Sequence, residues 1–291
     1  MAASYQDLKI YELYGDNDPQ YPVVISVPHA GRVFPSTFWN MTNLTEQALR
    51  GNEDCYMDEM LMPLANKGIP ILSMNIARAF IDVNRDQIEL DDHMFEDYPA
   101  DRVIFENSRC RSGYGLIHRV TADSKPIYKG LLSYQEVQQR IKDIYAVYHQ
   151  ALRKMVNDCA EKFGYCFLID CHSMPSKICS IMQDDAKIDV CLGDLFGQSC
   201  PEVLSASLKS ALEQKGYEVL KNVPYSGAYT TFHYCEPKQK KYTIQLEINR
   251  ALYVDEQTFE KKDCYEKIMS DLTESILQTA VKLKTLSDES V

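Results

Sequence analysis

Two histidines in this chain each close a short apolar run, a position where metal ligands and catalytic groups are often found. His29 ends the run Val23-Val-Ile-Ser-Val-Pro-His, and His172 ends the run Cys166-Phe-Leu-Ile-Asp-Cys-His. The carboxyl ends of parallel strands meet at one edge of a sheet, where open α/β folds build their sites. Neutral imidazole nitrogens bind zinc readily, so the pair could converge on one ion. Taken alone, either residue could be an ordinary loop histidine.

A catalytic zinc ion needs a third protein ligand and an open position for water, and an acidic cluster offers candidates. Glu53, Asp54 and Asp58 precede or begin a predicted helix. Adjacent helical residues point ~100° apart, so Glu53 and Asp54 cannot both face one ion. Acids at this position are also common partners of a helix dipole, and the residues alone leave the choice open. Asp170 could orient the ring of His172 as a hydrogen-bond acceptor, or it could cap the following turn.

Glu247 and three arginines could supply the rest of a hydrolytic site. Glu247 alternates with apolar residues in the predicted strand 242–248, where it is either a polar residue facing water or a general base. A general base takes the proton of a water molecule that a metal has made more acidic. The arginines close to the predicted strand ends are Arg78, Arg85 and Arg250. They are surface charges by default, but beside a metal they could hold a carboxylate or stabilise an oxyanion.

Short apolar runs alternate with helical patterns, which predicts an α/β fold with a mostly parallel sheet and helices on both faces. The predicted strands are 22–27, 69–74, 80–83, 165–170 and 242–248. One helix is predicted to end near Gly68, and another runs from a Ser133–Glu136 capping box to Gly164. Further helices are predicted from Pro201 to Gly216 and over 268–283. Residues 86–129 show no period, which favours an irregular insertion that covers the substrate.

The acidic composition argues against nucleic acid and membrane surfaces as partners. The 291 residues carry 31 Lys and Arg against 42 Asp and Glu, a net charge of −11, which repels phosphates and anionic lipids. No apolar run approaches the ~20 residues of a membrane span, and no signal peptide is recognisable, so we expect a cytoplasmic protein. The ten cysteines are too sparse for a disulfide scaffold, which predicts free thiols. We expect one domain over residues 1–291, as a monomer or a homodimer.

Six segments, taken in order, resemble the N-formylglutamate amidohydrolase family along about residues 22–255. They are Ser26-Val-Pro-His-Ala-Gly, Glu53-Asp, Ile81-Asp-Val-Asn-Arg, Asp170-Cys-His-Ser, Ser226-Gly-Ala-Tyr and Gln245-Leu-Glu. The family is similar to the zinc carboxypeptidases and to aspartoacylase. The resemblance implies a zinc-dependent enzyme with a central mixed sheet. Its substrate would be a small acidic N-acyl amino acid, N-formyl-L-glutamate, cleaved to formate and glutamate in histidine catabolism.

The resemblance also implies roles for individual residues. The metal ligands would be His29, Asp54 and His172, and Glu247 would be the general base. Residues implied in substrate binding, with Arg85 also in catalysis, are Asn84, Arg85, Arg78, Arg250, Tyr229 and His233. The chain departs from the carboxypeptidases because it has no acid three residues after the first histidine. It departs from the family in Cys55, where an aromatic residue is usual, and in residues 86–112, which match poorly.

Other functions are compatible with the same residues. The chemistry could act on another N-acyl amino acid, a peptide or a cell-wall amide. The scaffold could also be a metal-binding or ligand-binding protein without activity, although such a protein needs no base at Glu247. A cysteine nucleophile at Cys171 is disfavoured because the neighbouring Asp170 opposes formation of its thiolate.

Overall fold

The computed structural model describes residues 5–16, 18–102, 107–181 and 188–286, and its residues group into two compact units. Three segments of chain form each unit. The first unit comprises Met1–Glu12, Pro28–Glu53 and Met74–Ala151, and the second comprises Leu13–Val27, Asp54–Ser73 and Leu152–Val291. The expectation of a single hydrolase domain stays a prediction.

A mixed sheet, formed almost wholly by the second unit, confirms the predicted fold class. Its described strands are β1 (Tyr11–Tyr14), β2 (Val23–Val27), β3 (Ile71–Met74), β4 (Cys166–Met174), β5 (Val190–Gly193), β6 (Val219–Lys221) and β7 (Lys241–Asn249). Their order across the sheet is β1-β3-β2-β4-β7-β5-β6. The β2–β3, β2–β4, β4–β7 and β5–β6 pairs are parallel, and β5 runs antiparallel to β7.

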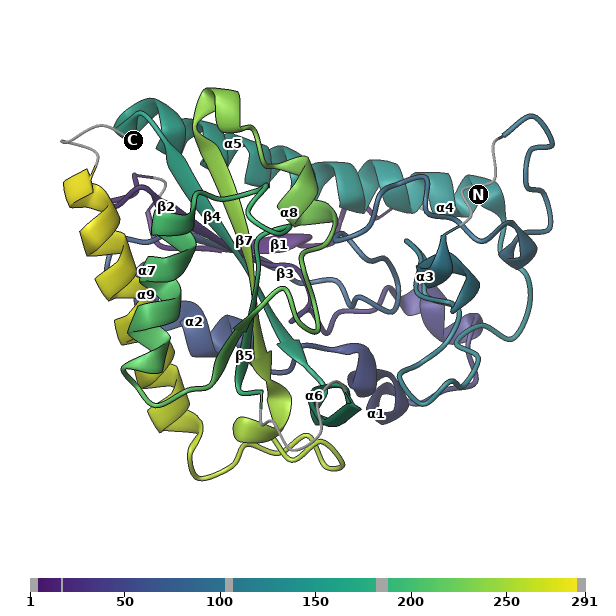
Figure 1. Cartoon of the computed structure of the whole chain (residues 1–291). Coiled ribbons are helices and arrows are strands. Elements are labelled where there is room, and N and C mark those ends of the chain that lie inside the picture. Colours follow the sequence, from purple (N-terminus) through teal and green to yellow (C-terminus); the bar gives the residue numbers. More distant parts are fainter. Residues whose placement is uncertain (1–4, 17, 103–106, 182–187, 287–291) are drawn as a thin grey trace. The chain divides into compact units, whose positions relative to one another are not determined.

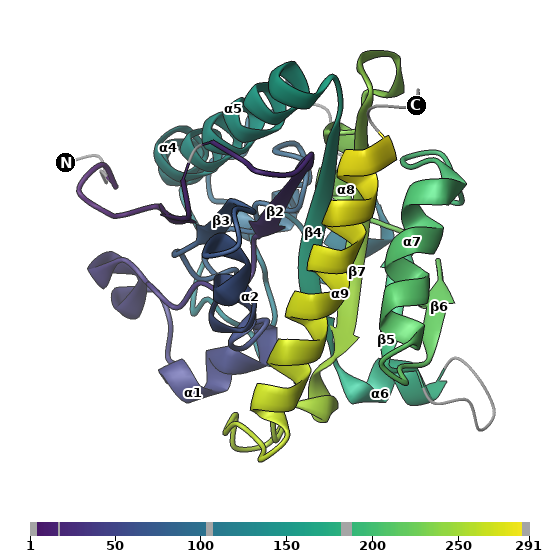
Figure 2. The ribbon, with the colours of Figure 1, turned by 90° about the vertical axis from the view of Figure 1, so that its left-hand side faces the viewer.

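Helices cover both faces of this sheet, and this explains why its central strands read as apolar runs. Along one face lie α2 (Met57–Ala65), α7 (Glu202–Glu213) and α9 (Tyr265–Leu286), of which α7 and α9 pack together (Figures 1 and 2). On the other side run α5 (Ala146–Phe163), which enters the second unit at Leu152, and α8 (Tyr229–His233) (Figure 1). Every residue of β4 and β7 is buried as a result.

Three short helices complete the described elements of the second unit. They are α6 (Ser176–Ile181), η5 (Pro237–Gln239) and η6 (Arg250–Leu252). Among the described residues, no helix is both long enough and apolar enough to cross a lipid bilayer.

Short helices and loops make up the first unit. Its helices are η1 (Ser36–Asn40), α1 (Glu46–Leu49), η2 (Arg50–Asn52), η3 (Asp92–Met94), α3 (Ser108–Arg111), α4 (Tyr134–Arg140) and the π-helical η4 (Ile141–Tyr145). The described part of 86–129 has only η3, α3 and isolated bridges, as expected of an irregular segment, while 103–106 lie outside the described residues. Its covering role over a substrate stays a prediction.

Two local predictions are wrong, each because a contact distant in sequence decides the structure. Residues 80–83 lie in turns and irregular backbone and not in a strand. The ring of Phe80 is buried without a strand because it packs against Phe38 and the buried Arg140. The backbone that follows turns at Asp82, whose side chain accepts a hydrogen bond from the amide of Asn84.

The predicted capping box at the start of α4 is the second error. The Ser133 side chain makes no capping hydrogen bond there. Instead the Tyr134 amide donates to Asp97 Oδ1 at 2.6 Å, and Glu136 accepts from the Arg140 Nε at 2.7 Å. The helix over 133–164 exists as predicted, divided into α4, η4 and α5, and it ends before Gly164, whose φ is +80°.

Candidate active site

His172 lies inside β4, whose last residue is Met174, and not beyond the strand end as the sequence predicted. In the register of β4 with β7, His172 pairs with Glu247 and Asp170 pairs with Gln245. Side chains two apart on a strand share one face of the sheet. The four side chains of this pairing therefore lie on one face of β4 and β7, two strands that are buried along their whole length.

Two carboxylates hold the ring of His172. The Nε2 lies 2.8 Å from Asp170 Oδ2, and the Nδ1 lies 3.1 Å from Asp54 Oδ2. Asp170 is itself fixed by the hydroxyl of Ser26 on β2, which donates to Oδ1 at 2.7 Å. Burial lowers the pKa of His172, but Asp170 and Asp54 outweigh burial and hold this pKa well above its usual value. Asp170 thus has the position of a carboxylate that orients a ligand histidine.

Asp54 and its neighbour Glu53 point to different partners. Asp54 is 1% exposed and contacts His172 through one oxygen, while its Oδ1 accepts from Arg250 Nη2 at 3.2 Å. Glu53 instead accepts from Arg32 Nε at 2.7 Å and from Arg50 Nε at 3.3 Å. Asp58, the third candidate, lies in the first turn of α2. These contacts favour Asp54 over Glu53 as a partner of His172.

Arg250 is buried and is held on two sides. Its Nε donates to Ser173 Oγ at 3.1 Å, and its Nη2 donates to the Ser173 carbonyl at 3.1 Å and to Asp54. Burial lowers the pKa of Arg250, but the charge of Asp54 outweighs it and raises this pKa above its usual value. The observed role of Arg250 is to position Asp54, and its contact with substrate stays a prediction.

In the first unit, the carboxylate of Asp82 contacts His29 and two further side chains. Its Oδ1 lies 2.7 Å from His29 Nε2, and its Oδ2 accepts from Arg78 Nε at 2.9 Å and from His118 Nε2 at 3.1 Å. Burial raises the pKa of Asp82, but Arg78 and His29 outweigh burial and hold this pKa well below its usual range. A carboxylate that stays ionised at neutral pH therefore orients His29, as Asp170 orients His172.

Sequence reasoning assigned no role to Asp82 and did not single out His118. His118 is 1% exposed and receives a hydrogen bond from Asn52 Nδ2 on its Nδ1 at 2.9 Å. The chain has only six histidines, and a histidine in a segment without a period was a signal that could have drawn attention to it. Its partners lie 36 and 66 positions away, so the sequence could not show the contacts.

Asn84 and Arg85 lie close after Asp82 in the chain, and Arg85 holds the backbone of the loop. Arg85 donates from Nε to the Tyr114 carbonyl at 2.9 Å and from Nη1 to the Asn84 carbonyl at 2.7 Å, and its Nη2 lies 3.8 Å from Asp82 Oδ2. Both residues are buried, at 1% and 7% exposure. Their predicted contact with a substrate carboxylate stays a prediction.

Glu247 is 6% exposed, so the interpretation of β7 as a half-exposed strand is wrong. Its Oε1 accepts a hydrogen bond from Gln245 Nε2 at 2.5 Å, and its backbone lies beside His172 on one neighbouring strand and Cys191 on the other. A carboxylate held in this way next to a candidate ligand histidine has the surroundings of a general base.

Tyr229 and His233 are found together in α8. Their rings stack with centroids 4.7 Å apart, and His233 Nε2 lies 2.7 Å from Arg153 Nη2. Their contact with substrate stays a prediction.

The surroundings of Cys171 disfavour a cysteine nucleophile. Burial, followed by the charge of Asp170, raises the pKa of Cys171 well above its usual value, and a protonated thiol is a poor nucleophile. All ten cysteines are free thiols, as predicted.

His29, Asp54 and His172 could together bind a metal ion. One ligand atom from each residue lies within 4.8 Å of the others, and all three residues are buried. Two imidazoles and one carboxylate are the donor set of many catalytic zinc sites, which leave one position open. Each histidine also contacts a second carboxylate, Asp82 or Asp170, as ligand histidines usually do. The residues present therefore fit zinc.

Comparison with known proteins points to one family. Residues 21–254 match the family model described as N-formylglutamate amidohydrolase. The N-formylglutamate deformylase of Pseudomonas putida is 28% identical over 240 residues, 81% of this chain and 82% of that protein. The enzyme of the same name from Pseudomonas aeruginosa is 26% identical over 266 residues, 88% and 92% of the two chains.

Solved structures share the fold of this chain. The crystal structure of N-formylglutamate amidohydrolase from Ralstonia eutropha JMP134 superposes with a TM-score of 0.88 at 29% identity, covering 98% of this chain and 100% of that one. A gene product of Agrobacterium tumefaciens shares the fold, with a TM-score of 0.65 at 14% identity over 97% of each chain.

Proposed function

The chain belongs to the N-formylglutamate amidohydrolase family, whose members hydrolyse a carbon–nitrogen bond, and we propose that it cleaves N-formyl-L-glutamate to formate and glutamate. The observation that carries the proposal is the group of two histidines and one carboxylate, found on motifs that the family match spans. We further propose that the protein acts in the cytoplasm in histidine catabolism, as a monomer or a homodimer.

His29, Asp54 and His172 would hold one zinc ion. When bound, zinc polarises the formyl carbonyl as a Lewis acid and lowers the pKa of water. Asp82 fixes the ring of His29, and Asp170 fixes the ring of His172, so each imidazole needs little reorganisation to bind the ion.

Glu247 would move the proton. One of its carboxylate oxygens takes a proton from the water that attacks the formyl carbon, and it then delivers this proton to the leaving amine nitrogen as the C–N bond breaks. The hydrogen bond from Gln245 holds Oε1, so the two oxygens of Glu247 are distinguished before substrate binds. Arg85 would stabilise the oxyanion, and the groups that would hold the substrate are Asn84, Arg85, Arg78, Arg250, Tyr229 and His233.

The test is hydrolysis of N-formyl-L-glutamate by the purified protein, with metal content measured on the same sample. We expect about one zinc ion per chain, loss of turnover after removal of metal by a chelator, and recovery on addition of zinc. N-acetyl-L-aspartate and an N-formylated neutral amino acid serve as comparison substrates. Faster turnover of either would show that N-formyl-L-glutamate is not the preferred substrate. Turnover unaffected by complete removal of metal would refute the zinc mechanism.

A further inference from the structure

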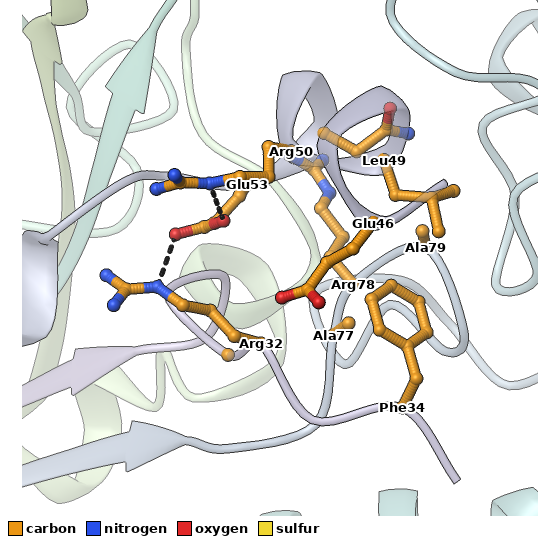
Figure 3. A pocket seen from close by; sticks show the side chains of 11 residues that line it. Arg32, Phe34, Glu46, Leu49, Arg50, Glu53, Ala77, Arg78 and Ala79 are labelled. Atoms are coloured by element: carbon orange, nitrogen blue, oxygen red, sulfur yellow. Dashed lines mark hydrogen bonds and ion pairs between the residues drawn. The ribbon is translucent and has the colours of Figure 1, made fainter. Parts of the chain in front are cut away.

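The first unit contains a small pocket lined by three arginines, two of which have no role in the site described above. Arg32, Arg50 and Arg78 line it together with Glu46, Glu53 and Phe34 (Figure 3). These residues come from three separate places: the chain after β2, the α1–η2 region and the chain after β3. Arginine recognises carboxylates through two parallel N–H groups, so the pocket has the composition of a carboxylate-binding site.

Glu53 holds two of these arginines in a fixed arrangement. Its Oε1 accepts from Arg32 Nε and its Oε2 from Arg50 Nε, at 2.7 and 3.3 Å. The terminal nitrogens of Arg32 and Arg50 extend in the same direction, away from the Glu53 carboxylate (Figure 3). Because the shared carboxylate fixes both side chains, little conformational entropy remains to be lost when an anion binds.

The side chains of the three arginines are more exposed to solvent than the glutamate that holds two of them. The side chains of Arg32, Arg50 and Arg78 are 36%, 21% and 20% exposed, whereas that of Glu53 is 7% exposed. A dissolved carboxylate can therefore reach the guanidinium groups but not displace Glu53 easily. Arg32 and Arg50 share the single charge of Glu53, which leaves one net positive charge on this group, whereas Arg78 is paired with Asp82. Glu46 is the second acid of the lining and opposes an incoming anion.

Arg78 connects the pocket to the candidate metal ligand. It lines the pocket and donates to Asp82, which in turn contacts His29. Asp82 therefore links His29 to one of the arginines that line the pocket. The cavity itself measures about 10 Å³, which is the space of one water-sized group and is too small for a whole metabolite.

We infer that Arg32 and Arg50, positioned by Glu53, form with Arg78 the subsite that binds the side-chain carboxylate of the substrate. The inference rests on the proposed function for the identity of that substrate. It makes the enzyme selective for N-acyl amino acids with an acidic side chain, and it gives Glu53 a positioning role in place of the metal-ligand role that the sequence left open.

Binding of L-glutamate and of L-glutamine, in which a neutral amide of similar shape replaces the side-chain carboxylate, tests the subsite by calorimetry without requiring turnover. We expect Arg50→Met and Arg32→Met each to weaken glutamate binding about tenfold or more, the usual effect of losing a charged hydrogen bond, and to leave glutamine binding unchanged. Lys154→Met, which removes an equal charge from an exposed ion pair on α5, is the control for long-range electrostatics and should have little effect.

Three further variants separate recognition from folding. Glu46→Gln removes the opposing charge, so it should tighten glutamate binding by roughly two- to fivefold, in line with a partly exposed charge pair. Glu53→Gln should weaken glutamate binding and raise KM for N-formyl-L-glutamate more than it lowers kcat. Arg32→Lys should restore part of the affinity that Arg32→Met loses.

The two proposals fail in different ways. If the protein hydrolyses N-formyl-L-glutamate and the arginine variants keep their preference for glutamate over glutamine, the subsite is wrong and the function stands. If no hydrolysis occurs but glutamate binds in a way that depends on Arg32 and Arg50, the subsite stands and the function is wrong. Folded arginine variants that lose glutamate and glutamine binding equally would also overturn the subsite.

Discussion

At the scale of single residues, each candidate ligand histidine depends on a buried carboxylate. Asp170 contacts His172 Nε2 and accepts from Ser26. We expect Asp170→Asn to weaken zinc binding about 10- to 100-fold, because the amide holds the ring less strongly and makes it less basic. Zinc affinity is measured by competition with a coloured chelator. Asp158→Asn, which changes an exposed ion pair on α5, is the matched control, and equal affinities in both variants would contradict the role of Asp170.

The second residue-scale prediction concerns Glu247. We expect Glu247→Gln to lower kcat by about 10²- to 10⁴-fold, the usual contribution of a general base, while zinc content stays that of the wild type. Glu274→Gln, which changes a residue of α9 that pairs with Lys215 at the surface, should leave kcat unchanged. A Glu247→Gln enzyme with normal zinc content and normal turnover would exclude Glu247 as the base.

The sequence indicated His29 and His172 because they end apolar runs, and the family resemblance selected Asp54, but neither could indicate the groups that hold these residues. His29, His172 and Glu247 were visible as polar residues within strand patterns. Asp82 and His118 lie in turns and loops, where no period predicts the direction of a side chain. Their roles depend on contacts between segments that are distant along the chain.

At the scale of elements, the pattern of apolar residues predicted the buried strands and the long helices. It failed where apolar side chains are buried in segments without regular secondary structure. β4 was predicted because both of its faces are covered, which selects apolar residues along the strand, whereas β7 was predicted from apolar residues that alternate with polar ones. The same argument wrongly gave a strand at 80–83, where the apolar residues pack beneath loops. The start of α4 was mispredicted because its cap, Asp97, lies 37 positions away from the amide that it accepts.

The turn after β2 gives a prediction at the same scale. A Cβ on Gly31 would lie 2.4 Å from the carbonyl oxygen of Ile76 and 2.6 Å from the carbonyl carbon of Asn75, so backbone would have to move. We expect Gly31→Ala to destabilise the protein by about 1–3 kcal/mol, as overpacking does, and to weaken zinc binding because His29 lies two residues before it.

Gly130 is the matched control for this substitution, because an added Cβ there meets nothing within 4 Å. Urea unfolding of Gly130→Ala should differ from the wild type by no more than about 0.5 kcal/mol. A Gly31→Ala protein with wild-type stability and wild-type zinc affinity would show that the close approach to residues 75–76 does not position His29.

At the scale of the whole molecule, the net charge of the chain and the charge of the pocket lining have opposite signs. The chain carries −11, yet the side chains that line the Arg32–Arg50–Arg78 pocket are net positive. The composition could show only that an anionic substrate requires local arginines. It could not show which ones, because the three arginines come from separate segments and meet only in the folded chain.

The dependence of overall stability on pH should also reflect one buried histidine of the first unit. Burial lowers the pKa of His118 to about 4, against about 6.5 in an unfolded chain. The Nδ1 accepts a hydrogen bond from Asn52, which favours the neutral ring. Above pH 6.5 neither state binds the proton, so His118 has no effect there. As pH falls from 6.5 to 4, only the unfolded chain gains the proton, and stability falls by up to about 3 kcal/mol.

His118→Gln should therefore flatten this part of the pH profile, even if the variant is less stable at pH 7.5. The measurement is the free energy of unfolding in urea at several pH values between 7.5 and 4.5, taken as the difference between variant and wild type. Asp82 does not interfere, because its depressed pKa places its own loss of stability below pH 3.8. His93→Gln, at an exposed histidine in the same unit, should leave the slope unchanged. A wild-type slope in His118→Gln would show that His118 is not the buried neutral group.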